Sequence, residues 1–85
     1  MIDLNLKTIG AVIKQLRKQH GQSQEVCSGL AGIARSHLAM IESSTKIPNF
    51  ETLWKLSYAF NLQPHELVKL IEEENKKISS EQLHI

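Results

Sequence analysis

Three neighbouring side chains in the middle of the sequence can hydrogen-bond a partner outside the chain. They are Arg35, Ser36 and His37, and they directly follow the segment "GLAGIA", in which Gly32 interrupts an apolar pattern. Arginine offers a planar fork of donors, and serine and imidazole each combine a donor with an acceptor. These side chains are suited to a polar partner, and their use depends on the elements that hold them.

Other chemistry finds little support in the sequence. The four histidines and Cys27 match no metal-ligand spacing. No nucleophile–base arrangement and no glycine-rich phosphate loop occurs. We therefore expect no enzyme activity, no metal and no cofactor.

Composition points to one cytoplasmic domain. A chain of 85 residues with a single cysteine forms one small core and no internal disulfide, which fits a reducing compartment. No apolar run approaches the roughly 18 residues that cross a bilayer, and the first residues lack the order of a signal peptide. We expect no membrane association.

The net charge of +1 is unevenly divided along the chain. Residues 1–46 carry six basic and three acidic side chains, a net +3, whereas residues 47–85 carry four basic and six acidic ones, a net −2. A molecule of this kind can present its first half to a polyanion.

The apolar pattern predicts five helices and no strand. The first helix carries a stripe at i, i+3, i+4 and i+7, formed by Ile9, Val12, Ile13 and Leu16, and it ends at Gly21. The second helix is expected from Gln24 to about Ala31. Ser23 is its N-cap, Cys27 and Leu30 point inward, and Gly32 ends it.

The remaining three helices are predicted over residues 35–43, 50–60 and from 64 onward. Asn49 is a suitable cap for the fourth, and Pro64 suits the first position of the fifth. The last helix is expected to fade through residues 72–77. Their apolar residues are Leu38, Ile41, Leu53, Leu56, Phe60, Leu67, Leu70 and Ile71.

The second and third predicted helices are joined by only residues 32–34. Two helices linked by so short a turn with a glycine, and crossing steeply, form a helix-turn-helix motif. The second helix of that motif fits the major groove of B-DNA, and its first residues reach the base edges. In this chain those residues are Arg35, Ser36 and His37.

Here the sequence resembles the helix-turn-helix domain of the Cro and phage-repressor type. That family includes restriction–modification controller proteins and many small bacterial regulators. The resemblance covers residues 9 to about 70 and rests on "GQSQE", "GIARSHL", "IE" and Pro48 in this order and spacing. It implies an all-α, compact bundle of five short helices, a lambda-repressor-like DNA-binding domain. We expect this domain over residues 1–75 and a frayed tail over 76–85.

The resemblance also implies roles for individual residues. The residues expected to read bases are Arg35, Ser36, His37 and Met40. Those expected to contact phosphates are Ser23, Gln24, Ser43, Ser44 and Lys46. Arg17 and Glu42 are expected to form a structural pair.

The chemistry of the base-reading residues agrees with these roles. An arginine fork matches guanine O6 and N7, a contact worth about 1–3 kcal/mol of discrimination, and a methionine facing the groove can pack against a thymine methyl. The alternative for each polar residue is an ordinary solvated side chain. For Met40 the alternative is a partly buried position.

Several positions depart from the pattern of that family. Ala34 replaces a small polar cap, which costs about 1 kcal/mol. Gly29 inside the second helix costs roughly 1 kcal/mol relative to alanine. Cys27 stands where leucine is usual, and Ser43-Ser44 replace a basic residue or asparagine followed by glycine. These changes predict a lone domain of reduced stability and a weaker phosphate contact.

The single tryptophan and single tyrosine lie together on the predicted fourth helix. Trp54 and Tyr58 are four residues apart and off its apolar stripe, and Phe50 extends their line by one turn. They form either a partly buried cluster covered by the fifth helix or the tail, or a dimer interface, where exposed aromatic residues are typical. The resemblance favours the dimer, which would place two recognition helices one turn of DNA apart.

The sequence as a whole predicts a sequence-specific regulator of transcription. It would bind double-stranded DNA as a homodimer on a palindromic operator in a bacterium or phage. The alternative is an antitoxin-type module that binds a partner protein through the fifth helix and the tail, for which the acidic "EEEN" segment is suited.

Overall fold

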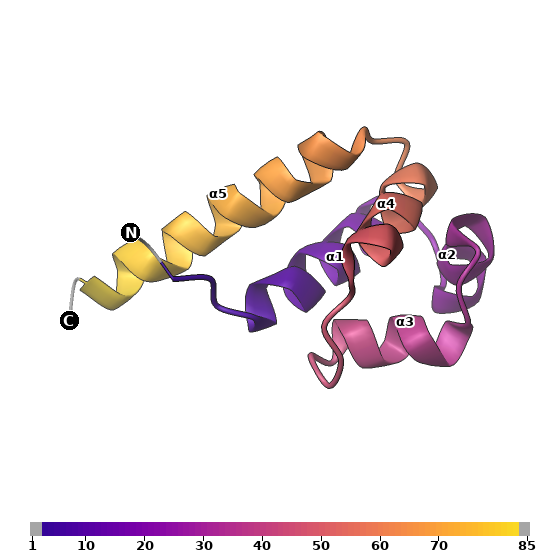
Figure 1. The fold of residues 1–85 in the computed structure, drawn as a ribbon, viewed down its shortest axis with the longest axis horizontal. Coiled ribbons are helices and arrows are strands. Elements are labelled where there is room, and N and C mark those ends of the chain that lie inside the picture. Colours follow the sequence, from indigo (N-terminus) through magenta and orange to yellow (C-terminus); the bar gives the residue numbers. More distant parts are fainter. Residues whose placement is uncertain (1–2, 84–85) are drawn as a thin grey trace.

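The computed structural model describes the backbone of residues 3–83 and the side chains of residues 3–78. This part of the chain forms five helices and no strand, and Figure 1 shows how they are arranged. They are α1 (Lys7–Gln19), α2 (Gln24–Ala31), α3 (Arg35–Glu42), α4 (Phe50–Ala59) and α5 (Pro64–Leu83). The predicted all-α fold and its order of elements are confirmed.

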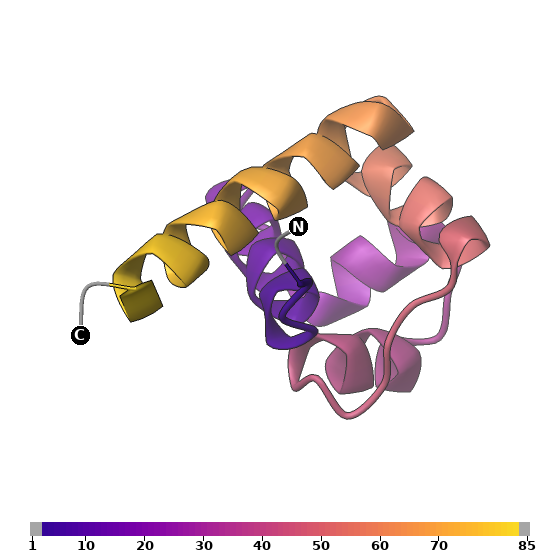
Figure 2. The ribbon, with the colours of Figure 1, turned by 60° about the vertical axis from the view of Figure 1, so that its left-hand side comes forward.

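The helices pack as a ring around one small core. Helix α2 packs against α3 and α4, α1 packs against α3 and α5, and α4 packs against α5. Figure 2 shows α5 passing over α1 while α3 lies on the opposite side of α1. The side chains that fill the interior include Ile13, Leu38, Leu56, Phe60 and Leu67, each at most 1% exposed. None of the described helices combines the length and apolar character that crossing a membrane requires.

Local sequence signals set four of the helix ends. The Ser23 hydroxyl accepts a hydrogen bond from the Val26 amide at 3.1 Å, and the Asn49 carboxamide oxygen accepts one from the Thr52 amide at 2.8 Å. Both are side-chain N-caps, as predicted. Gly21 and Gly32 end α1 and α2 with φ of 65° and 73°, a left-handed conformation that glycine adopts without strain.

The prediction that Leu30 points inward is wrong. The inward residues of α2 are Cys27, Ser28 and Ala31, and Leu30 lies to one side of this stripe with 49% of its surface exposed. In so short a helix, two apolar residues three apart do not fix the buried direction. The small residues at 28 and 31 let α2 approach its neighbours closely, and this close packing determines which side of α2 is buried.

Helix α5 continues beyond the expected end, to Leu83. Its second half has a partner that the apolar pattern did not indicate, because Asn75 is 6% exposed and hydrogen-bonds the segment before α1. Figure 1 shows that segment running beside α5. Leu70, by contrast, is exposed. The domain boundary at residue 75 stays a prediction, and residues 84–85 of the proposed tail lie outside the described residues.

Candidate nucleic-acid interface

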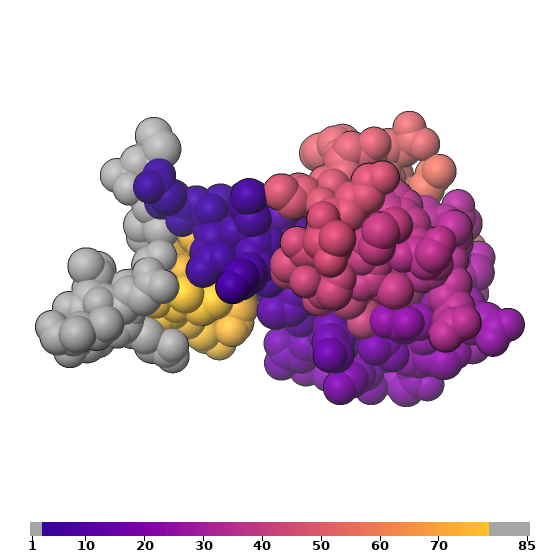
Figure 3. All heavy atoms as spheres, turned by 90° about the horizontal axis from the view of Figure 1, so that it is seen from below, coloured from indigo at the N-terminus to yellow at the C-terminus, as the bar shows by residue number. Residues whose placement is uncertain are grey.

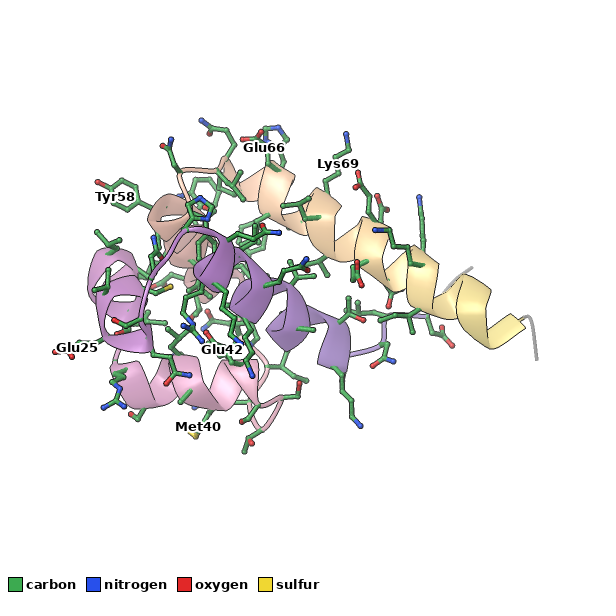
Figure 4. All side chains as sticks on the ribbon, turned by 180° about the vertical axis from the view of Figure 1, so that it is seen from behind. Glu25, Met40, Glu42, Tyr58, Glu66 and Lys69 are labelled. Atoms are coloured by element: carbon green, nitrogen blue, oxygen red, sulfur yellow. The ribbon has the colours of Figure 1, made fainter. Side chains whose placement is uncertain are left out.

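Helix α3 divides its side chains between the core and the solvent. Leu38 and Ile41 are buried, whereas Arg35 and Ser36 are exposed and His37 is half-buried at the edge. Met40 projects from α3 away from the rest of the domain (Figure 4). The structure thus brings the four predicted base-reading residues onto the outer part of one helix. We call Arg35, Ser36, His37 and Met40 the recognition surface.

The turn before α3 fixes where this surface begins. The Gly32 amide donates to Gly29 O at 3.3 Å and the Ile33 amide donates to Ser28 O at 3.0 Å, which closes the end of α2. Ile33 packs against the core. Ala34 caps α3 without a side-chain hydrogen bond, as its residue type dictates. The first amides of α3 therefore lack a side-chain acceptor at the end that carries Arg35.

A buried polar network holds α3 in place. The Arg17 guanidinium binds the Glu42 carboxylate in a fork, with Nε to Oε2 at 2.6 Å and Nη2 to Oε1 at 3.0 Å. Arg17 Nη1 also donates to Gln22 O at 2.8 Å. The two charged side chains are only 11% and 3% exposed. Since they come from α1 and α3, the expected pair ties the recognition helix to α1.

The charge of Arg17 is secured by its partner. The hydrogen bond and the charge of Glu42 raise the pKa of Arg17 above its ordinary value, even though burial acts in the opposite direction. Gln24 joins the same carboxylate, because its Nε2 donates to Glu42 Oε1 at 3.2 Å. Gln24 is thereby held at the first turn of α2, and its contact with a phosphate stays a prediction.

Backbone contact adds a second attachment between α1 and α3. Gly10 is buried in α1, and a Cβ at this position would lie 3.1 Å from Glu42 O and closer still to Ile41 O. A side chain at residue 10 would push the end of α3 away. The glycine is therefore required by the close approach of the two helices.

The loop after α3 is shaped by its own hydroxyl groups. The Ser43 hydroxyl donates to Met40 O at 3.1 Å, so the 2.8 Å bond between Ser43 Oγ and Thr45 Oγ1 is donated by Thr45. Ser44 is left-handed with φ of 63°, where the sequence has no glycine. Lys46 is exposed. The three predicted phosphate contacts of this loop lie together directly after the recognition surface.

Cys27 is an interior residue with no exposed surface. Burial raises the pKa of its thiol to about 11, with a further increase from Glu42 and a decrease from Arg17. A thiol kept protonated in this way is a poor nucleophile and a poor metal ligand. Among the residues that the structure describes, no cluster of three or more metal-ligating side chains occurs.

The predicted dimer residues lie on a different face. Phe50, Trp54 and Tyr58 are 68%, 57% and 75% exposed, and the rings of Phe50 and Trp54 are 6.0 Å apart. We call these three residues the aromatic surface. No side chain within residues 3–78 covers them, which disagrees with a cluster covered by that part of α5.

Trp54 separates two hollows on the aromatic surface. One hollow of about 460 Å³ is lined by Phe50, Trp54, Gln63, Pro64, His65 and Val68. The other, of about 470 Å³, includes Tyr58, Lys55 and Leu62. Figure 4 shows Tyr58 pointing outward on the side of the molecule opposite to Met40.

Some residues that shape the interface were missed from the sequence. Gln22 accepts from Arg17 through its carbonyl and donates from Nε2 to Ala59 O at 2.9 Å, which links the α1–α2 turn to the end of α4. Thr45 was missed as the partner of Ser43. A glutamine or threonine in a loop carries no sequence signal for such contacts, because they depend on where another helix ends.

Known proteins resemble this chain in sequence and in structure. The helix-turn-helix family model matches residues 13–67. The crystal structure of the restriction–modification controller protein C.AhdI from Aeromonas hydrophila is similar, with 31% identity and a TM-score of 0.69 over 73% of this chain and 94% of that chain. The controller protein C.Esp1396I has a TM-score of 0.78 at 19% identity, over 85% of this chain and 94% of that chain, which is a likeness in fold. Among curated proteins, none matches the sequence. The resemblance and the fold expected from the sequence are confirmed.

Proposed function

The chain belongs to the Cro and phage-repressor type of the helix-turn-helix family, whose members are DNA-binding regulators of transcription. From this we propose that it acts as a homodimer on a palindromic operator in the bacterial cytoplasm. The observation that carries the proposal is the division of α3. Its inner residues are buried and its end is bound to α1 by Arg17 and Glu42, while Arg35 and Ser36 remain exposed. An exposed helix held this firmly is suited to entering the major groove.

The recognition surface reads bases. Arg35 at the first turn of α3 offers its fork to guanine O6 and N7, and Ser36 beside it donates to or accepts from a base edge. Met40 lies one turn further along the outward side and packs against a thymine methyl. His37, at the edge of the surface, reaches a base or the adjacent backbone.

Phosphates are bound at both ends of the motif. Ser23 and Gln24 stand at the first turn of α2, where backbone amides and the helix dipole favour an anion. Ser43, Ser44 and Lys46 form the second contact after α3. These groups position the protein without reading sequence.

The dimer forms through the aromatic surface. Trp54 lies between two hollows, so in a two-fold pair the Trp54 side chain of each copy fits a hollow of the other. Exposed tryptophan and tyrosine are typical of the buried centre of protein interfaces. The dimer would supply two recognition helices one turn of DNA apart, and their two-fold symmetry matches a palindromic site.

The similar structures support a more specific context. Both are restriction–modification controller proteins, and a role in controlling such a system is the version of the regulator that we favour. A restriction enzyme encoded beside this gene would support it. A toxin gene in that place would favour the antitoxin alternative.

Selection of bound fragments from genomic DNA tests the main proposal. The purified protein is expected to enrich one short palindromic sequence, and Arg35→Ala is expected to lose the preference at one position of each half-site, a loss of about 1–3 kcal/mol. Affinity should fall steeply with salt, because bound phosphates release counterions. Absence of any enriched site would overturn the proposal.

Sedimentation tests the dimer separately. The wild-type protein is expected to sediment as a dimer and Trp54→Ala as a monomer, while Lys69→Ala, an exposed residue of α5 outside the aromatic surface, remains dimeric. A Trp54→Ala protein that still sediments as a dimer would exclude the aromatic surface as the interface.

A further inference from the structure

The start of α1 lies beside the end of the recognition helix. A Cβ on Gly10 would lie 3.1 Å from both Glu42 O and Ser44 Oγ. Figure 3, which views the molecule from the side of α3, shows the segment before α1 and the start of α1 next to the loop that follows α3. The first turns of α1 therefore border the loop to which we assign a phosphate contact.

Lys7 occupies this border. It lies one turn before Gly10 on the same side of α1, since residues three apart on a helix are neighbours. Its side chain is exposed, and within residues 3–78 no acidic group pairs with it. The first turn of α1 contains no acidic residue either, so the positive end of the helix dipole is not neutralised.

A buried side chain fixes the position of Lys7. Asn75 Oδ1 accepts from the Asn5 amide at 2.8 Å, and Asn75 Nδ2 donates to Asp3 O at 3.1 Å. The Asn5 side chain in turn accepts from the Lys7 amide at 3.0 Å. The backbone from Asp3 to Lys7 is thus held in one conformation by α5, which lowers the entropy lost when Lys7 binds.

We propose that Lys7 binds a DNA phosphate and extends the phosphate contact of Ser43, Ser44 and Lys46 along the edge of the domain. Asn75 acts as a positioning residue for Lys7. This inference rests on the proposed function, and it concerns a residue for which neither the helix-turn-helix pattern nor the recognition surface provides a role. The contact is to the backbone of DNA, so it adds affinity without sequence preference.

The test compares Lys7→Ala with Lys69→Ala on the duplex obtained by selection. Lys69 is an exposed lysine of α5 that lies on the side of the molecule opposite to Met40 (Figure 4). Fluorescence anisotropy over a range of salt concentrations is expected to give Lys7→Ala a log–log salt slope smaller in magnitude by about 1. Its affinity should fall equally on the selected and a scrambled duplex. Lys69→Ala should leave both slope and affinity unchanged.

The outcomes separate the two proposals. If Lys7→Ala keeps the wild-type slope and affinity while Arg35→Ala loses sequence preference, the contact by Lys7 is excluded and the regulator stands. If the wild-type protein binds neither duplex, the regulator itself is excluded. Lys7 is a surface residue, so its replacement does not threaten folding.

A double-mutant cycle tests the positioning role of Asn75. Asn75→Ala is expected to weaken DNA binding in the wild-type background and to have no further effect when Lys7 is already alanine. A loss of general stability would weaken binding equally in both backgrounds, and that result would overturn the positioning role. Circular dichroism of each variant establishes that the helices are retained.

Discussion

The recognition surface and the aromatic surface both expose side chains suited to contact, but they are supported differently. The recognition surface is supported by a buried ion pair, a backbone contact at Gly10 and the buried thiol of Cys27. The aromatic surface carries its rings on one helix, with hollows on both sides of Trp54. The first surface is supported by contacts within one chain, whereas the second has open hollows, which we propose that a second copy fills. Changes behind the recognition surface should therefore cost folding stability, and changes on the aromatic surface should cost association.

Removal of the Glu42 carboxylate is expected to have the largest effect. Glu42→Ala leaves the Arg17 guanidinium buried without its partner, a loss of about 3–5 kcal/mol in unfolding free energy. Denaturation in urea, followed by circular dichroism, measures it. The matched control is Glu51→Ala on α4, which breaks an exposed pair with Lys55 at 3.2 Å and should cost less than about 1 kcal/mol. Similar losses in both variants would contradict the comparison.

Alkaline pH should destabilise the interior behind α3 through Cys27. Its thiol pKa is raised from 9.0 to about 11 in the folded protein, so the unfolded chain loses the proton first. The stabilising contribution is complete below pH 9.0, falls as pH rises through about 11, and amounts to about 2–3 kcal/mol. The measurement is the unfolding free energy of the wild type minus that of Cys27→Ala across this range. If this difference in unfolding free energy did not change with pH, the pKa of the Cys27 thiol would not be raised by folding.

A methyl group at Gly10 of α1 should weaken the packing of α1 against the end of α3. Gly10→Ala places a Cβ against the main-chain oxygens of Ile41 and Glu42, which cannot rotate away. The expected loss in unfolding free energy is about 1–3 kcal/mol, typical of an overpacked interior. Thermal unfolding measures it, and an unchanged midpoint would mean that α3 can shift freely relative to α1.

At Gly29, substitution by alanine is expected to raise rather than lower the unfolding free energy. A Cβ at this position of α2 would have no atom within 4 Å, and its backbone is not left-handed. Gly29→Ala should therefore raise the unfolding free energy by about 0.5–1 kcal/mol. Together with Gly10→Ala it forms a pair of identical substitutions with opposite outcomes, and a loss of stability at Gly29 would contradict the geometry.

The smallest effect on folding is expected on the aromatic surface. Trp54→Ala, compared with the wild type at a protein concentration where both are monomers, should change the unfolding free energy by less than about 0.5 kcal/mol. Its effect should appear only as the protein concentration is raised and the wild type gains stability from association. A large loss in the monomer would place Trp54 with the core rather than with an interface.

Much of the fold could be predicted because the signals are local. Ser23, Gly32 and Asn49 act on the turn in which they stand, so their residue types were sufficient to place the ends of α2 and the start of α4. The inward apolar residues of α3 followed in the same way from their spacing. The exposed position of Arg35 and Ser36 also follows from the pattern, since their neighbours Leu38 and Ile41 must face the core.

The parts that could not be predicted depend on residues far apart in the sequence. Asn75 is a polar residue in a charged segment, and nothing near it indicates that it binds the backbone at Asp3 and Asn5. The extension of α5 to Leu83 was also missed, because the charged residues from 72 to 77 interrupt the apolar pattern that predicts a helix. Gln24 was assigned to phosphate alone, because its contact with Glu42 exists only once α2 and α3 have crossed.

The separation of support from recognition in α3 has a consequence for how such a protein can change. The ion pair of Glu42 with Arg17 and the close approach of α1 at Gly10 hold the helix, while Arg35, Ser36 and Met40 are exposed. Exposed positions of this kind usually accept substitution within about 0.5 kcal/mol. For the regulator that we propose, new operator preferences would thus arise by single substitutions on the outer side of α3, without compensating mutations in the core. The same fold can in this sense carry different sets of DNA-contacting residues, in evolution and in design.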